Sequence, residues 1–99
     1  MSARDNLMEQ RIHVLPMGPH EYAVTVSEGM VTTNHRVTIS ERFLDDLGIW
    51  ELDEKRLVEE TFAYLLERVP ASAIQHDVDL DSVADEHDDY IPEVKTRLA

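Results

Sequence analysis

The most regular spacing of potential metal ligands lies in an acidic stretch near the C-terminus. Five aspartates occupy relative positions 1, 3, 5, 9 and 12 of this stretch: Asp77, Asp79, Asp81, Asp85 and Asp88. Oxygen ligands at such spacings can surround one hard cation, as in the calcium loop of an EF-hand. Two residues depart from that template, because Ser82 replaces the usual glycine and Asp88 replaces a longer glutamate. The sequence therefore favours a helix-capping aspartate followed by a solvated acidic helix, with a calcium-like site as the alternative.

Other catalytic and metal-binding patterns have little support. The five histidines (His13, His20, His35, His76 and His87) form neither an HExxH motif nor an HxH pair. His76 and His87 flank the acidic stretch and could join its carboxylates around a transition metal, although surface positions are the simpler interpretation. Cysteine is absent, no GxSxG motif occurs, and the three glycines are widely separated. We therefore predict no catalytic residue, no resident metal and no cofactor, and hence a protein that is not an enzyme.

The charge of the chain narrows the classes of partner. Twenty-one acids against nine Lys and Arg give a formal net charge of −12. This charge opposes binding to nucleic acid and to anionic membranes, because both need cationic side chains. Residues 77–93 contain eight acids and no Lys or Arg, which is typical of a solvated face or of a docking surface for a basic partner. The predicted interaction surface consists of Asp85, Glu86, Asp88, Asp89 and one aromatic residue, Tyr64.

One long helix must organise the core. Residues 53–69 place apolar side chains every three to four positions: Leu57, Val58, Phe62, Leu65, Leu66 and Val69. This periodicity predicts an amphipathic helix that is capped by Asp53 and ends before Pro70. Tyr64 lies off the apolar stripe, so it is either an exposed interface residue or the edge of the core. Trp50 precedes the helix and is predicted to fill the junction with a shorter helix.

The N-terminal half reads as strands. Residues 22–27 and 35–40 alternate apolar and polar side chains, which predicts a β-hairpin whose loop is longer than a two-residue turn. Residues 11–15 alternate weakly and are a candidate third strand. Ser40 is placed to cap a short helix that ends at Gly48.

Shorter helices are predicted in the C-terminal half. Residues 72–76 read as a short helical turn, and Asp79 or Asp81 can cap a helix over residues 82–89. Pro92 suits the first turn of a final helix.

Strands followed by helices indicate an α+β fold, with a two- or three-stranded antiparallel sheet packed on one long helix and short flanking helices. We predict a flexible segment at residues 1–10 and a single domain at residues 11–99. No apolar run approaches the ~20 residues of a membrane span, and the N-terminus has no signal-like stretch. These features predict a soluble cytoplasmic protein.

Residues 35–94 resemble a widespread group of small bacterial proteins without an assigned activity. The resemblance rests on the hairpin, on the segment LVEETFAYLLERVPASAI (residues 57–74), on Asp79-Leu80, and on the ending Tyr90-Ile91-Pro92-Glu93. The chain departs from the group where Ile91 replaces an aromatic residue and where residues 77–89 are unusually acidic. The resemblance implies the same fold and a bacterial origin, and it adds no function.

Three functions are therefore open. The first is a small non-enzymatic interaction or regulatory domain with an unknown protein partner. The second is a divalent-cation-binding module that uses Asp77–Asp88, and the third is an acidic mimic of DNA that inhibits a basic protein. The unblunted edge of the strand at residues 35–40 also predicts a homodimer, because unpaired strand edges favour pairing with a second copy.

Overall fold

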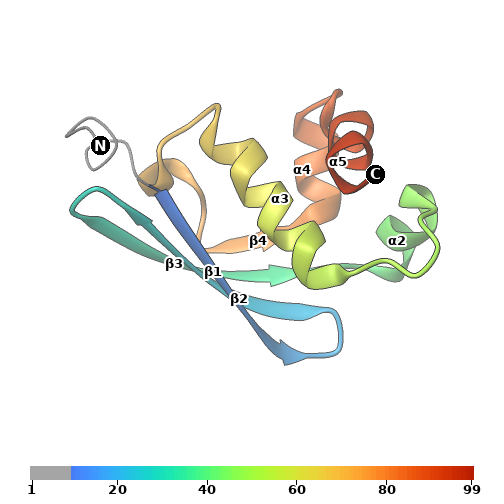
Figure 1. Ribbon diagram of the computed structural model, residues 1–99, viewed down its shortest axis with the longest axis horizontal. Coiled ribbons are helices and arrows are strands. Elements are labelled where there is room, and N and C mark those ends of the chain that lie inside the picture. Colours follow the sequence, from blue (N-terminus) through green and yellow to red (C-terminus); the bar gives the residue numbers. More distant parts are fainter. Residues whose placement is uncertain (1–9) are drawn as a thin grey trace.

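Three consecutive strands open the part of the chain that the computed structural model describes, residues 10–99. β1 (Gln10–Gly18), β2 (Glu21–Glu28) and β3 (Val31–Thr38) pair antiparallel in that order. The candidate third strand is thereby confirmed as β1. A short fourth strand, β4 (Asp77–Asp79), pairs parallel with β3, so the sheet is mixed (Figure 1). The predicted purely antiparallel sheet is wrong in this respect. The predicted flexible segment lies outside the described residues, apart from its last residue, Gln10.

The connection between β2 and β3 is a two-residue turn, not the longer loop that the sequence predicted. Both strands extend further than their alternating cores, so that Glu28 pairs with Val31 across Gly29-Met30. Gly29 has a φ of 62°, a conformation that glycine adopts without steric cost. The prediction erred in the bounds of the strands, because both pair up to the residues that flank Gly29-Met30.

Four α-helices follow within residues 10–99, and their capping residues agree largely with the sequence. α2 (Glu41–Leu47) begins after Ser40, whose hydroxyl accepts a hydrogen bond from the Phe43 N–H, and ends at Gly48. α3 (Glu54–Leu66) is the predicted long helix, capped by Asp53 but ending three residues before Val69. A 3₁₀ turn, η1 (Ala71–Ala73), follows Pro70. The last two helices are α4 (Leu80–Glu86) and α5 (Tyr90–Leu98).

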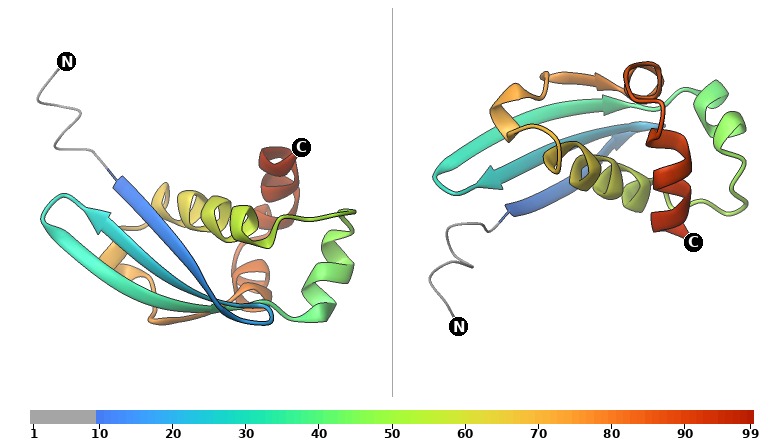
Figure 2. Two further views of the ribbon diagram at one scale, coloured as in Figure 1. Left: turned by 60° about the horizontal axis from the view of Figure 1, so that its bottom comes forward. Right: turned by 90° about the horizontal axis from the view of Figure 1, so that it is seen from above.

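α3 lies across one face of the sheet, with α5 beside it and α4 at the end of β4 (Figure 2). The strands turn alternate side chains toward this helix, and Val24, Val26 and Val37 are buried there. α3 contributes its predicted apolar stripe, of which every member within the helix is buried: Leu57, Val58, Phe62, Leu65 and Leu66. The opposite face of β3 carries exposed polar side chains such as Asn34 and Arg36. The core is therefore a single layer between the sheet and the helices.

The burial of Trp50 and Tyr64 is the reverse of what the sequence suggested. Trp50, predicted to fill a helix junction, is 88% exposed. Tyr64, offered as an exposed interface residue, is fully buried because α5 packs against the side of α3 that carries it, with the rings of Tyr64 and Tyr90 5.2 Å apart. The proposal of Tyr64 as a surface residue is therefore wrong, and so is the burial of Trp50.

The open edges of the sheet also differ from expectation. β4 pairs with residues 36–38 of β3, which covers much of the edge on which the predicted homodimer depended. The remaining long edge belongs to β1, which contains Pro16 and so is partly protected against pairing. Pairing between two copies stays a prediction.

Candidate functional site

The acidic stretch folds into a strand and a helix, not into a cation-binding loop. Residues 77–79 form β4, and α4 begins directly afterwards. The Asp79 carboxylate caps α4 by accepting a hydrogen bond from the Asp81 N–H at 3.0 Å. The Asp81 carboxylate in turn accepts a hydrogen bond from the Ser40 hydroxyl at 2.6 Å. These two carboxylates therefore hold α4 in place, as the capping interpretation predicted.

The ligand set of the calcium-like alternative does not converge. Within residues 10–99, no group of three or more His, Asp or Glu side chains is placed to hold a metal ion. The five aspartates of the calcium-like template lie in three different places. Asp77 and Asp79 are the two ends of β4, Asp81 and Asp85 lie on α4, and Asp88 lies in the turn after α4. The two flanking histidines also separate, because His76 pairs with Asp77 at 3.3 Å whereas the ring of His87 lies against Tyr64. A helical backbone directs successive carboxylates outward, where a calcium loop would direct them inward.

The acidic stretch instead borders a cavity of about 230 Å³ between the C-terminal end of α3, the segment after it and α4. We call this cavity the α3–α4 crevice. Its apolar lining comprises Leu65, Val69, Ala73, Ile74, Val78 and Val83. Its polar lining comprises Gln75, Asp77, Asp79, Ser82, Glu86 and His87. The lining contains no Lys or Arg, so the crevice combines apolar side chains with three carboxylates.

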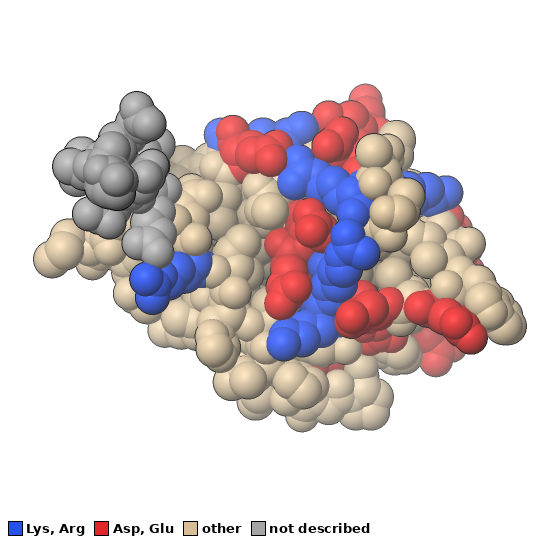
Figure 3. Space-filling view, in the orientation of Figure 1, with Lys and Arg blue, Asp and Glu red and all other residues tan. Residues whose placement is uncertain are grey.

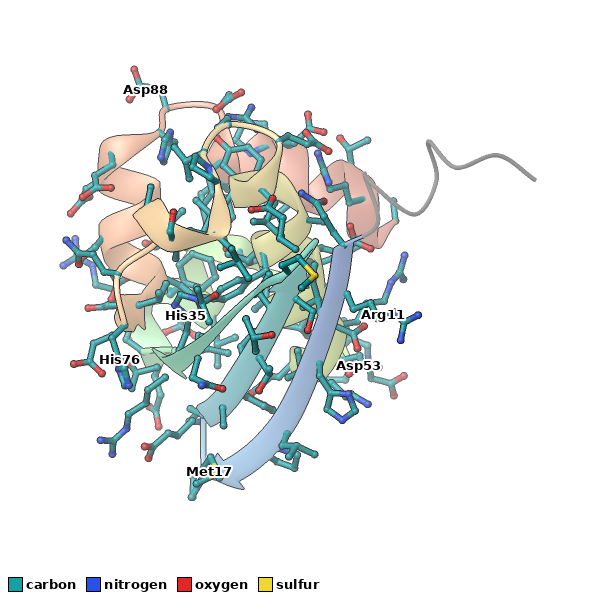
Figure 4. The ribbon with its side chains drawn as sticks, turned by 90° about the vertical axis from the view of Figure 1, so that its left-hand side faces the viewer. Arg11, Met17, His35, Asp53, His76 and Asp88 are labelled. Carbon is teal, nitrogen blue, oxygen red and sulfur yellow. The ribbon has the colours of Figure 1, made fainter. Side chains whose placement is uncertain are left out.

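A buried histidine fixes one wall of the crevice. His35 on β3 is only 4% exposed, and its Nδ1 lies 2.7 Å from the backbone oxygen of Gln75. Because a carbonyl can only accept, Nδ1 carries the hydrogen, and in the neutral ring Nε2 accepts from the Thr33 hydroxyl at 2.8 Å. The backbone N–H of Arg36 donates a hydrogen bond to the backbone oxygen of His76 at 2.7 Å. Figure 4 shows His35 within the domain and His76 at its edge. The segment that lines the crevice is thus bonded to the sheet.

A cluster around Tyr64 fixes the opposite wall. The ring of His87 meets the Tyr64 ring edge-on, with centroids 5.8 Å apart. The Tyr64 hydroxyl donates to the Asp89 carboxylate, and the Arg68 guanidinium stacks 3.6 Å above the Tyr64 ring while it donates to Asp89 at 3.0 Å. Burial, together with the hydrogen bond to Asp89, raises the pKa of Tyr64 to about 12. The same hydrogen bond holds the pKa of Asp89 below its usual range. Asp89, a predicted interaction residue, is therefore exposed, but its carboxylate is already engaged by Tyr64 and Arg68.

The raised tyrosine pKa values predict alkaline unfolding. Burial raises the pKa of Tyr22 to about 12, helped by the nearby Glu54 carboxylate, and burial also raises the pKa of Tyr90. The folded state therefore holds these protons more tightly than the unfolded chain, where tyrosine has a pKa of about 10. The resulting stability is complete below pH 10 and is lost as the pH rises from 10 to 12. We expect tyrosinate absorbance to develop above pH 10 together with the loss of circular dichroism. Tyrosinate formation centred near pH 10 in a protein that stays folded would contradict this, and Tyr64→Phe should move the transition to higher pH.

The remaining predicted interaction residues are available at the surface. Asp85, Glu86 and Asp88 are exposed, and within residues 10–99 none of them has an ion-pair partner. Other acids are compensated: Arg97 pairs with both Glu67 oxygens at 2.8 Å and with Glu93 at 3.1 Å. Basic side chains accordingly run between acidic ones on the face shown in Figure 3. That face lacks the continuous negative surface that a DNA mimic requires.

Comparisons with protein-family models, with curated proteins and with solved structures found no match. The resemblance to the bacterial group therefore stays a prediction. Within residues 10–99, no helix has the length and apolar character needed to cross a membrane. The α3–α4 crevice is the part of the site that sequence reasoning missed, because it depends on β4. β4 consists of only three residues, Asp77, Val78 and Asp79, which is too short an alternation to predict a strand.

Proposed function

We propose that the protein is a non-enzymatic interaction domain that binds a basic segment of a partner protein, with a lysine side chain of that segment entering the α3–α4 crevice. The observation that carries this proposal is the composition of the crevice, whose lining is half apolar and whose polar half includes three carboxylates and no Lys or Arg. A lysine side chain matches both properties, because it joins an aliphatic stem to an ammonium group.

The size of the crevice supports a single side chain as its occupant. Its volume of about 230 Å³ is below the range of roughly 300–1,000 Å³ that is typical of sites for drug-sized ligands and cofactors. Glu86 at the C-terminal end of α4 and Asp77 and Asp79 on β4 all line the crevice, so an ammonium group within it meets negative charge from two elements. The net charge of −12 would also accelerate the approach of a basic partner.

The rigid surroundings of the crevice favour binding without rearrangement. One wall is bonded to the sheet through His35, and the other is held by the contact of His87 with Tyr64. Walls that are already ordered reduce the entropy lost when a side chain is bound.

Three small probes with the same apolar part can test the proposal. Butylammonium reproduces the lysine side chain, butanol is its neutral analogue and butyrate its anionic analogue. We expect butylammonium alone to shift the amide NMR signals of residues lining the crevice, with an affinity that falls as salt is added. A Gly-Ser peptide with one lysine should bind at the same signals, and its norleucine analogue should not.

Two double variants distinguish the effect of the carboxylates at the crevice on butylammonium affinity from the effect of the net charge of the protein. Asp77→Asn combined with Glu86→Gln should weaken butylammonium binding roughly tenfold, which corresponds to about 1.4 kcal/mol for two exposed charges. Glu41→Gln combined with Asp45→Asn removes the same charge from α2 and should leave the affinity unchanged. Equal binding of all three probes, no binding of any, or equal loss in both double variants would overturn the proposal.

A further inference from the structure

The only tryptophan of the chain is turned away from the core by the loop that contains it. Trp50 is 88% exposed, whereas Ile49 and Leu52 pack against the core on either side of it. Between them, Glu51 has a φ of 55°. This left-handed conformation is uncommon for a residue with a side chain and costs about 1 kcal/mol or more. The chain thus partly buries Ile49 and Leu52 and accepts local strain at Glu51, while the largest apolar side chain stays in water.

The loop that carries Trp50, residues 48–53, is anchored at both ends. Gly48 closes α2 with a φ of 65°. At the other end Asp53 caps α3, and the next residue, Glu54, contacts His20 Nδ1 at 2.8 Å and the Tyr22 hydroxyl at 3.1 Å. These contacts join the loop to the β1–β2 turn, which lies at the same end of the domain (Figure 1). Trp50 is therefore presented from an ordered loop.

Trp50 lies within an acidic segment of the sequence, which Arg42 precedes and Lys55 and Arg56 follow. Residues 43–54 contain five acids and no Lys or Arg: Asp45, Asp46, Glu51, Asp53 and Glu54. Within residues 10–99, Asp45, Asp46 and Glu51 have no ion-pair partner. An exposed indole in a segment that also carries unpaired carboxylates is complementary to a guanidinium group, which stacks on an aromatic face and donates hydrogen bonds to carboxylates in the same plane.

We propose that the loop at residues 48–53 is a second docking surface, which binds an arginine-bearing segment of another protein by stacking the guanidinium on Trp50. It lies at the N-terminal end of α3, whereas the α3–α4 crevice lies at the C-terminal end. The charge selects this occupant over two others. A second copy would bring −12 against −12, and an anionic lipid surface would be repelled in the same way.

The fluorescence of the single tryptophan tests the surface directly. The probes are a Gly-Ser peptide that contains two arginines, the same peptide with lysines, and the same peptide with citrullines, which keep the shape without the charge. We expect the arginine peptide to change the Trp50 emission, the lysine peptide to bind more weakly and the citrulline peptide to have no effect. Added salt should weaken the binding of the arginine peptide.

Calorimetry with variants completes the test. Trp50→Ala should weaken the binding of the arginine peptide about tenfold, and Glu51→Gln should weaken it to a smaller extent. Met30→Ala, which removes an apolar side chain that is 100% exposed in the β2–β3 turn, should have no effect. The crevice variant Asp77→Asn with Glu86→Gln should also leave this binding unchanged, so the two proposals fail independently. An unchanged affinity in Trp50→Ala, an equal response to citrulline, or a Trp50 response to neutral lipid vesicles but not to arginine would overturn the proposal.

Discussion

Replacing Phe62 with alanine should lower the free energy of unfolding by about 3–5 kcal/mol. Phe62 is fully buried at the centre of α3, and its ring lies 5.2 Å from the ring of His35 on the sheet. The truncation removes apolar surface from the core and leaves a cavity between two rigid elements, which can collapse only partly. Urea unfolding followed by circular dichroism measures the change.

Trp50→Ala is the matched control for this prediction, because it also removes a large aromatic side chain. Trp50 is almost fully exposed, so its loss should change the free energy of unfolding by no more than about 0.5 kcal/mol. Similar costs for the two substitutions would mean that the assignment of buried and exposed aromatic residues is wrong.

Replacing His35 with leucine should cost about 1–3 kcal/mol and also weaken the binding of butylammonium. Leucine retains apolar bulk but cannot bond the Gln75 carbonyl or the Thr33 hydroxyl, and unsatisfied polar groups at a buried site are costly. The wall of the α3–α4 crevice would then lose its side-chain bond to the sheet. Amide hydrogen exchange should become faster in residues 74–76 than in β2.

His76→Leu is the control for the His35 prediction. His76 is exposed, and its side chain contacts only Asp77 among the described residues. We expect unchanged stability and unchanged exchange in this variant. Uniformly faster exchange throughout the His35→Leu variant would show a general loss of stability and no specific role in the wall.

Local patterns predicted the parts of the fold that depend on neighbouring residues. The stripe centred on Phe62 identified α3, and short polar side chains identified the caps at Ser40, Asp53 and Asp79. Such signals suffice because a helix period and a cap are decided within one or two turns of chain. The parallel pairing of β3 with β4 joins segments that are far apart in the sequence, and no local pattern announces it.

The two aromatic errors have equally physical origins. Hydrophobicity predicts burial for Trp50, but the residue after it, Glu51, adopts a left-handed conformation and the Trp50 side chain is exposed. A helical stripe predicts one buried face for α3, but α5 packs against a second face through Tyr90, which bonds Thr61 and contacts Tyr64. The candidate site could not be predicted from the sequence for the same reason, since the crevice is formed by elements that meet only in three dimensions.

The parallel strand β4 gives the crevice a particular place in the folding of the chain. β1, β2 and β3 are joined by short turns and can pair early. β4 follows β3 only after two helices, α2 and α3, so its pairing with β3 closes a long segment of chain and is expected later. The crevice therefore comes into existence only when the last quarter of the chain has docked. An occupant of the crevice therefore binds only the fully folded domain. Its binding stabilises the domain against local opening of the C-terminal part. A partner that needs the crevice would thus distinguish a finished chain from one whose end has not yet folded.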